Sequence, residues 1–178
     1  MKPALLLIDL QNDYFPGGLF PLWNTDAVLG RTLKAIEAAK TERMPIIHIR
    51  HIADPDAGIA PFFNKDTEGT AIHADILAAA PHSPIVIKSF ADSFHMTALK
   101  ALLYQEGITD LLIAGMMTQN CVTHTAISQS AEDYEVTVLT DCCTTVSEPI
   151  HQIALHALST RVNLATAADV LPLPPEAA

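Results

Sequence analysis

Short continuous apolar runs alternate along the chain with longer stretches in which apolar residues recur every three or four positions. Continuous runs are typical of strands buried on both faces of a parallel sheet, and the spaced pattern is typical of amphipathic helices. The runs predict strands at residues 4–10, 45–50, 84–88, 110–115, 136–139 and 162–164. The spaced pattern predicts helices at residues 25–43, 71–80, 96–106, 121–133 and 147–158, with a last helical turn or two at 166–171.

This alternation predicts an α/β fold with right-handed crossovers between parallel strands. We expect a three-layer α/β/α architecture of the Rossmann-like kind, with a six-stranded, mainly parallel, doubly wound sheet. The length of 178 residues fits a single domain, residues 1–178. No Gly-x-Gly-x-x-Gly follows the first strand and no Walker sequence is present, so nothing in the sequence supports nucleotide binding.

Charge and cysteine content narrow the choice of partners and compartment. The net charge of −10 argues against nucleic acids and anionic membranes as partners. With 49% hydrophobic and 17% charged residues, we expect some apolar surface to be buried in a homo-oligomer, a dimer or larger. Three cysteines do not form a disulfide framework, and the first apolar run is too short for a membrane span or a signal peptide. We therefore expect a cytoplasmic protein.

The stretch most suggestive of chemistry is residues 115–122, which reads as the end of a strand, a tight turn and the start of a helix. Cys121 lies at or near that helix start, where the partial positive charge of the helix lowers a thiol's pKa and favours the thiolate. Backbone N–H groups of the same turn can bind a developing oxyanion. The alternative is a buried, inert cysteine, and we interpret Cys142 and Cys143 in that way.

Two more reactive side chains stand at the carboxyl ends of predicted strands. Asp9 ends the first strand and Lys88 the third, and ligands of open α/β sheets bind outside these ends. A carboxylate there can take the proton of Cys121 and return it to a leaving amine, while an ammonium group holds the thiolate. Taken singly, Asp9 also fits a turn residue and Lys88 a solvated strand end.

Loops above the same strand ends carry candidate substrate contacts. The longest, residues 51–69, shows no regular pattern, and loops of this length are usually functional or mobile. An aromatic lining suits a flat, small-molecule substrate. The candidates are Gln11, Phe15, Trp23, His51, Phe62, Phe63 and Phe94. Core or interface packing explains the aromatic residues equally well, and Gln11 fits a role in ordering its own loop.

Three signatures in order resemble those of isochorismatase-like cysteine hydrolases. The first is IDLQND at residues 8–13, and the second is IKS at 87–89 followed by SF at 93–94. The third is GMMTQNCV at 115–122, followed by TA at 125–126. The resemblance extends over nearly the whole chain, to about residue 171. It is specific for the superfamily and much less so for a substrate.

The resemblance implies a role for each reactive residue. Cys121 matches the nucleophile, Asp9 the proton acceptor and Lys88 the third member of a catalytic triad. It also implies a cis peptide bond between Met116 and Met117, and an oxyanion hole formed by the backbone N–H groups of Met117 and Cys121. The expected reaction is hydrolysis of a small amide, imide or related C–N bond through a thioester at Cys121, without a cofactor.

Two departures refine this reading. True isochorismatases cleave a vinyl ether and lack the cysteine, so Cys121 favours acyl transfer. Nicotinamidases of the superfamily bind a metal through an Asp-x-His pair and a further His, but only His48 and His51 stand near that place and no Asp-x-His follows. We therefore expect no metal site. A metal-dependent nicotinamidase-type amidase and a non-catalytic binding protein are the alternatives.

Overall fold

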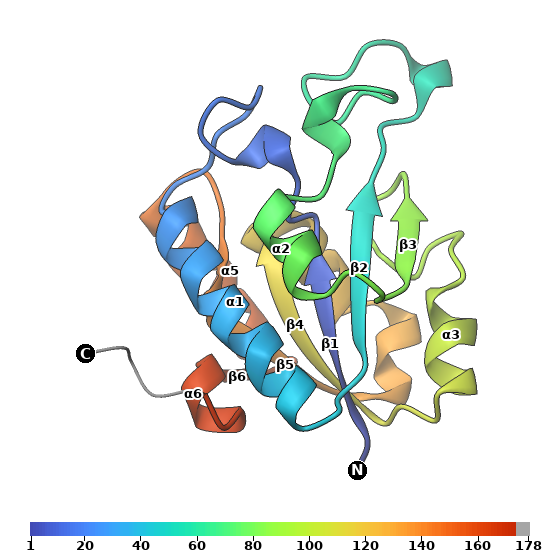
Figure 1. The fold of residues 1–178 in the computed structure, drawn as a ribbon, viewed down its shortest axis with the longest axis vertical. Helices are drawn as coiled ribbons and strands as arrows, with labels where there is room; N and C mark the ends of the chain where they lie inside the picture. The colour runs from blue at the N-terminus through green and yellow to red at the C-terminus, as the bar shows by residue number, and fades with distance from the viewer. Residues whose placement is uncertain (174–178) are drawn as a thin grey trace.

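The computed structural model describes residues 1–173, which form a six-stranded sheet with helices on both faces (Figure 1). Residues 174–178 of the predicted domain lie outside the described residues. All paired strands are parallel, in the order β3-β2-β1-β4-β5-β6. The strands are β1 (Pro3–Ile8), β2 (Ile46–His51), β3 (Ile85–Lys88), β4 (Asp110–Met116), β5 (Glu135–Thr144) and β6 (Asn163–Ala165). The predicted doubly wound α/β fold is confirmed.

The strand order reverses between β1 and β4. From β1 the chain moves outward through β2 to β3, and it then returns to the other side of β1 to continue through β4, β5 and β6. In sheets of this kind, the crevice at the reversal point is where ligands bind. Asp9 directly follows β1, and Cys121 comes shortly after β4, so both lie at this point of the sheet.

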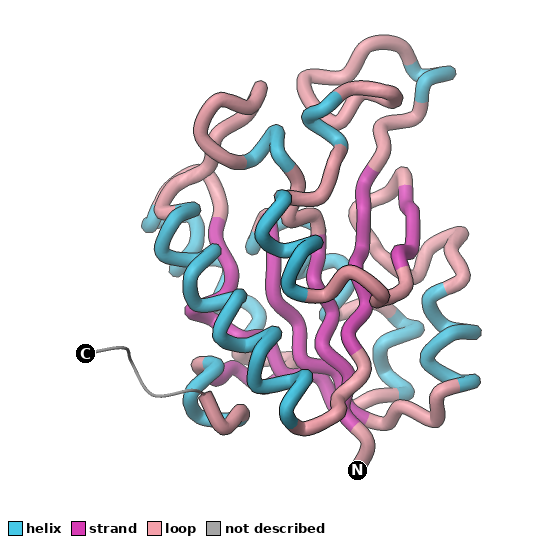
Figure 2. Tube along the Cα trace, viewed as in Figure 1, coloured by secondary structure: helices cyan, strands magenta, loops and turns pink. Residues whose placement is uncertain are grey.

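Helices cover both faces of the sheet (Figures 1 and 2). An apolar core lies between the sheet and the helices on each face. The helices of one face are α1 (Thr25–Thr41), α2 (Ala74–Ala79) and α6 (Ala167–Val170). Those of the other face are α3 (Leu99–Gln105), α4 (Thr123–Ala126) and α5 (Glu148–Leu158). The continuous apolar run of β1 is buried on both faces, as its sequence predicts.

Gly115 lets β4 approach β1 closely next to the reversal point. It pairs with Ile8 and has a φ of +137°, and a Cβ atom there would lie 2.0 Å from the Ile8 carbonyl oxygen. Any side chain would push the strands apart. The glycine therefore holds the segment after β4 against the residue that follows β1, which is Asp9.

The helix predicted over 121–133 is divided into shorter pieces. A π-helical turn at Thr118–Val122 precedes α4, and a 3₁₀ helix spans Gln129–Asp133. Ser and Thr side chains here form hydrogen bonds with backbone groups that a regular helix would pair with each other. The Thr123 hydroxyl donates to the Thr118 carbonyl over 2.6 Å, and the Ser128 hydroxyl accepts from the backbone N–H of Ser130. These local bonds end a regular helix early.

Strand β5 is longer than the predicted 136–139. It passes an irregularity in its pairing with β4 and continues until Gly115 pairs with Cys143 and Met116 with Thr144. Cys142 and Cys143 therefore lie inside the strand, buried and unpaired with each other, and not after it. The prediction that Cys142 and Cys143 are packed thiols is confirmed, but they lie within β5 and not in a segment that follows it. No helix of residues 1–173 is long and apolar enough to cross a bilayer.

Two loops rise above the carboxyl ends of the strands (Figure 2). The first follows β1 and carries Asp13, and the second follows β2 and carries Phe63. Asp13 joins them, because its carboxylate accepts hydrogen bonds from the backbone N–H of Phe63 (2.7 Å) and of Leu19 (3.2 Å). Tyr14 from the first loop packs against Phe63 from the second, with ring centroids 4.5 Å apart. A buried carboxylate and an aromatic contact thus fix both loops over the reversal point.

Candidate active site

Asp9, Lys88 and Cys121 meet at the carboxyl rim of the sheet. The Lys88 ammonium lies 2.8 Å from Asp9 Oδ2 and 3.2 Å from Cys121 Sγ. Their residue exposures are 0%, 2% and 3% in that order, so this polar cluster is almost fully removed from water. The structure therefore brings together the three residues that the sequence proposed for catalysis.

His51, the last residue of β2, is a fourth member of this cluster. Its Nδ1 lies 3.0 Å from Lys88 Nζ. The Gln11 side chain holds the His51 backbone: Oε1 accepts from the His51 N–H (2.7 Å), and Nε2 donates to the carbonyls of His51 (2.8 Å) and Thr70 (2.9 Å). Both Nε2 hydrogens of Gln11 are used in this way. Gln11 therefore orders the loop, which was the alternative to substrate contact.

The expectation that Cys121 rests as a thiolate is wrong in this structure. Burial raises the pKa of Cys121, and Asp9 raises it further, while Lys88 acts in the opposite direction. Cys121 also lies at the fourth position of a π-helical turn and not at the amino end of a long helix. The partial positive charge of a helix start therefore does little to lower the pKa of this thiol. The resting group is the thiol, and a base must remove its proton before it can attack.

Lys88 remains protonated despite its burial. Desolvation lowers its pKa, but the charges of Asp9 and Cys121 outweigh this, and the pKa is raised overall. Its partner Asp9 adopts a left-handed backbone conformation with a φ of 52°. Asp9 Oδ2 accepts from Lys88, whereas Oδ1 is buried without a hydrogen-bond partner among residues 1–173. One carboxylate oxygen is thus tied to the ammonium and the other is open.

The turn that carries Cys121 is anchored from α5 and from the end of β5. Thr118 Oγ1 and His151 Nδ1 are 2.8 Å apart in the buried interior, and the Thr145 hydroxyl donates to Gln119 Oε1 over 2.5 Å. The peptide bond Met116–Met117, just before this turn, is cis. Sequence reasoning missed Thr118 and His151, because no local pattern separates His151 from the other helical histidines.

The aromatic residues predicted to contact substrate each pack against a different ring. Phe15 packs on His73 with ring centroids 4.3 Å apart, and Phe94 stacks on Tyr134 at 6.1 Å. Both are core contacts, which was the alternative reading for these residues. Trp23 lies 6.1 Å from the His151 ring, and Phe62 lies 5.2 Å from that of Tyr14.

Tyr14 and Phe63 are closer to the reactive cluster. Phe63 is one of the aromatic loop residues that the sequence proposed, whereas Tyr14 was not predicted as a substrate contact. The rings of His51 and Phe63 lie 5.8 Å apart. Burial raises the pKa of the Tyr14 hydroxyl, and the charges of Asp9 and Cys121 raise it further, which places this hydroxyl within their electrostatic reach. Sequence reasoning missed Tyr14 because it lies in a turn-rich loop, whose geometry follows from the Asp13 hydrogen bonds and not from periodicity.

Comparison with known proteins agrees with this geometry. The family model of the isochorismatase domain matches residues 3–170. The chain belongs to the isochorismatase family. It is 33% identical to the uncharacterized isochorismatase family protein YddQ of Bacillus subtilis over 83% of this chain and 80% of that protein. It is 27% identical to a maleamate amidohydrolase of Pseudomonas putida over 79% of this chain and 71% of that protein.

A solved isochorismatase hydrolase homologue from Oleispira antarctica has the same fold. It shares 34% sequence identity with this chain, covers 95% of each chain and superposes with a TM-score of 0.83. The isochorismatase-like superfamily is one of hydrolases with amidohydrolases among its members, and this chain belongs to that superfamily.

The isochorismatase-family site also contains a set of potential metal ligands. One ligand atom each from Asp9, His51 and Cys121 lie within 4.8 Å of one another. Lys88 Nζ is within hydrogen-bond distance of all three residues, at 2.8, 3.0 and 3.2 Å. An ammonium with three N–H groups already supplies the positive charge and the donors that these atoms need. The residues present therefore fit an internal ammonium and not a metal ion.

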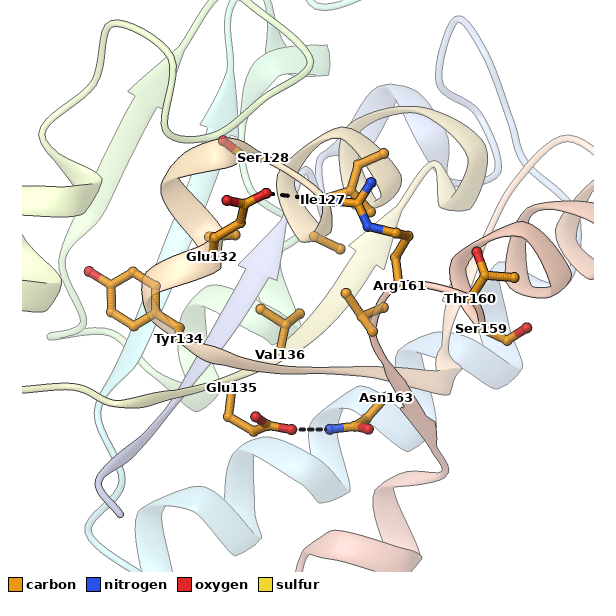
Figure 3. Close-up of a pocket in the computed structure, with 13 residues that line it drawn as sticks. Ile127, Ser128, Glu132, Tyr134, Glu135, Val136, Ser159, Thr160, Arg161 and Asn163 are labelled. Carbon is orange, nitrogen blue, oxygen red and sulfur yellow. Dashed lines mark hydrogen bonds and ion pairs between the residues drawn. The ribbon is translucent and has the colours of Figure 1, made fainter.

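A separate hollow of about 490 Å³ lies at the amino ends of β5 and β6, at the opposite rim of the sheet (Figure 3). Its charged residues pair with neighbours: Arg161 lies 3.6 Å from Glu132, and Asn163 donates to Glu135 over 2.5 Å. None of the predicted site residues lines this hollow. The proposed chemistry therefore stays with the cluster at the carboxyl rim.

Proposed function

We propose that this isochorismatase-family protein is a cysteine hydrolase that cleaves a C–N bond of a small amide or imide through a thioester at Cys121. The observation that carries the proposal is the contact of Lys88 with both Asp9 and Cys121 in a buried cluster. The amidohydrolase among its relatives supports the same bond type. The role of each residue follows from which protons it can hold.

In the first half-reaction, Asp9 acts as the base. Its Oδ1 has no hydrogen-bond partner in the described structure, and it takes the thiol proton as Cys121 Sγ attacks the carbonyl carbon. Lys88 stabilises the negative charge that appears on sulfur. We assign the oxyanion to the backbone N–H groups of Met117 and Cys121. Asp9 then gives the proton to the leaving nitrogen, the C–N bond breaks and a thioester remains.

In the second half-reaction, Asp9 takes a proton from water as the water attacks the thioester carbonyl. The C–S bond breaks, the acid product forms and the proton returns to Cys121. The raised pKa of Cys121 fits this cycle, because a thiol that rests protonated requires the adjacent carboxylate. A small molecule is thus the proposed partner. A homo-oligomer and a cytoplasmic location also stay predictions.

The test compares the wild type with Cys121→Ser and Asp9→Asn on a panel of small primary amides and cyclic imides, with release of ammonia or ring opening as the readout. We expect each variant to lose at least about 10³-fold in kcat/KM. Acid-quenched intact mass spectrometry should show an acyl adduct on the wild type and none on Cys121→Ser. Cys142→Ala, a change at a buried thiol in β5, is the matched control.

The non-catalytic alternative makes the opposite prediction. A binding protein with a vestigial pocket would bind members of the panel, and neither turnover nor an adduct would depend on Cys121. A hydrolytic rate that is equal in the wild type and in Cys121→Ser would contradict the nucleophile assignment.

A further inference from the structure

We infer that the outer face of α5, together with the neighbouring end of α4, is the surface through which two copies of this chain form a two-fold symmetric dimer. Ile153 lies at the centre of this surface and meets the same residue of the second copy. The inference is independent of the proposed hydrolase chemistry, because no residue that carries it belongs to the reactive cluster. It follows from the charge of this face, the side chains that α5 exposes and the hollow at the end of α5.

The outer face of α5 differs from that of α1 in having no charged residues. Residues 149–160 contain no Asp, Glu, Lys or Arg, and residues 123–131, which include α4, contain none either. The cores of protein–protein interfaces are depleted of charged residues in the same way. By contrast, the 17 residues of α1 include five charged side chains: Asp26, Arg31, Lys34, Glu37 and Lys40.

The charge of the whole chain favours a second copy on this face. At a net charge of −10, two copies repel each other through most of their surfaces. A face without charge lets them meet with no like charges in contact. A basic partner protein would gain nothing here, because its charges find their complement on the acidic parts of the surface. The uncharged face therefore suits self-association.

The side chains of α5 form a line that is complementary to itself. Pro149, Ile153 and Ala157 are four residues apart and share one side of the helix. Ile153 is 69% exposed, and it is the middle residue of α5, with five residues before it and five after it. A two-fold axis at Ile153 makes α5 cross its copy antiparallel, so that Ile153 meets Ile153 and Pro149 meets Ala157. A two-fold interface requires one such self-complementary patch.

The hollow at the amino ends of β5 and β6 extends this complementarity. Ile127 and Thr160 are among the residues that line it (Figure 3). Thr160 comes seven residues after Ile153, and Val146, an exposed apolar residue, comes seven residues before it. The two-fold axis therefore brings Val146 of each copy over the hollow of the other. A protruding apolar side chain and a hollow thus lie at equal separations from the axis.

A second apolar surface, at the edge strand β3, provides the comparison. Ile85 and Ile87 are exposed there, and Ile87 is 54% exposed. However, β3 has only four residues and directly follows Pro84. Short edge strands and prolines are features by which proteins avoid pairing between sheet edges. We therefore assign the dimer to α5 and use Ile87 as the matched control.

Sedimentation velocity on the full chain tests the assignment with two isoleucine variants. Ile153→Glu places two carboxylates side by side at the two-fold axis, so it should raise the dimer dissociation constant at least about 100-fold. Ile87→Glu adds the same charge at an exposed isoleucine of β3 and should leave this constant unchanged. Circular dichroism and a thermal melt of each variant show that the fold is retained.

A disulfide tests the position of the axis without adding charge. Ile153→Cys puts a thiol beside its own symmetry copy, whereas Gln152→Cys is turned by about 100° around the helix. The three native thiols are buried. Because a disulfide requires two closely spaced β-carbons, we expect copper phenanthroline to link Ile153→Cys into dimers at least about tenfold faster than Gln152→Cys.

Several results would overturn the inference and leave the proposed hydrolase function intact. A wild type that stays monomeric at about 0.1 mM excludes a dimer of useful affinity. A dimer that Ile87→Glu dissociates and Ile153→Glu leaves intact has its interface at β3. A dimer that responds equally to both variants, or equal linking of Ile153→Cys and Gln152→Cys, would show that the axis does not lie at Ile153.

Discussion

The Lys88 ammonium donates to Asp9 Oδ2 over 2.8 Å, and neither side chain has any exposed surface. The two residues are 79 positions apart: Asp9 follows β1 and Lys88 ends β3, and β2 lies between these strands in the sheet. Taking both charges out of water is costly, and their attraction repays the cost only while both are present. The pair therefore couples the chemistry of the site to the stability of the fold.

We predict that Lys88→Met destabilises the protein by about 3–5 kcal/mol, because it leaves the Asp9 carboxylate buried without a counter-charge. Urea unfolding at pH 7 measures this change. Adding Asp9→Asn to Lys88→Met should recover most of the lost free energy of unfolding, since the remaining amide carries no charge. A double variant as unstable as the sum of the two single variants would contradict the coupling.

A second prediction concerns metals. Because Lys88 lies within hydrogen-bond distance of Asp9, His51 and Cys121, we expect activity to be unchanged after dialysis against EDTA. The variant Lys88→Ala removes the ammonium and leaves a carboxylate, an imidazole and a thiol, which together suit Zn²⁺. We expect this variant to bind Zn²⁺ at least tenfold more tightly than the wild type in a competition assay with a chromogenic chelator. Activity that is lost on chelation and restored by a metal would favour a nicotinamidase-type mechanism.

A third prediction concerns the bond between Thr118 and His151, which anchors the turn that carries Cys121. Thr118→Val keeps the shape of the side chain and removes the hydroxyl. We expect kcat to fall about 10- to 100-fold with little change in KM, because a displacement of about 1 Å at the nucleophile is enough for such a loss. Thr118→Ser, which keeps the hydroxyl, is the control and should retain most of the activity. Equal losses in both variants would show that packing, and not this bond, matters.

The sequence was sufficient for the sheet and for the three reactive residues, for a physical reason. Continuous apolar runs identify strands buried on both faces, and parallel strands bring their carboxyl ends to one rim. Asp9, Lys88 and Cys121 are each placed by such a strand end. The family signatures, which contain these three residues and occur in the family's order, supported the same assignment. The isochorismatase domain covers nearly the whole chain.

What the sequence could not show depends on contacts between distant loops. Gln11 orders the backbone of His51, and Asp13 ties the first loop to Phe63, through hydrogen bonds that leave no periodic signal. The pKa of Cys121 was predicted in the wrong direction. Its burial and the proximity of Asp9 depend on the assembled fold, whereas the helix-start argument considered only its neighbours in sequence.

The last prediction follows from the three buried thiols. Burial raises the pKa of Cys121 and of Cys142, and it raises that of Cys143 to about 12. An unfolded thiol titrates at about pH 8.5. Above that pH the unfolded chain has lost these protons while the folded chain still holds them. Stability therefore falls as pH rises, by up to about 1.4 kcal/mol per thiol for each pH unit.

With three thiols, the free energy of unfolding should drop by as much as about 4 kcal/mol between pH 9 and pH 10. Urea unfolding in the presence of a reductant measures this slope. Cys143→Ala removes one titrating group from the unfolded chain, so its slope should be about a third smaller than that of the wild type. An equal slope in both proteins would mean that Cys143 ionises alike in the folded and unfolded chains, and that burial does not hold its proton.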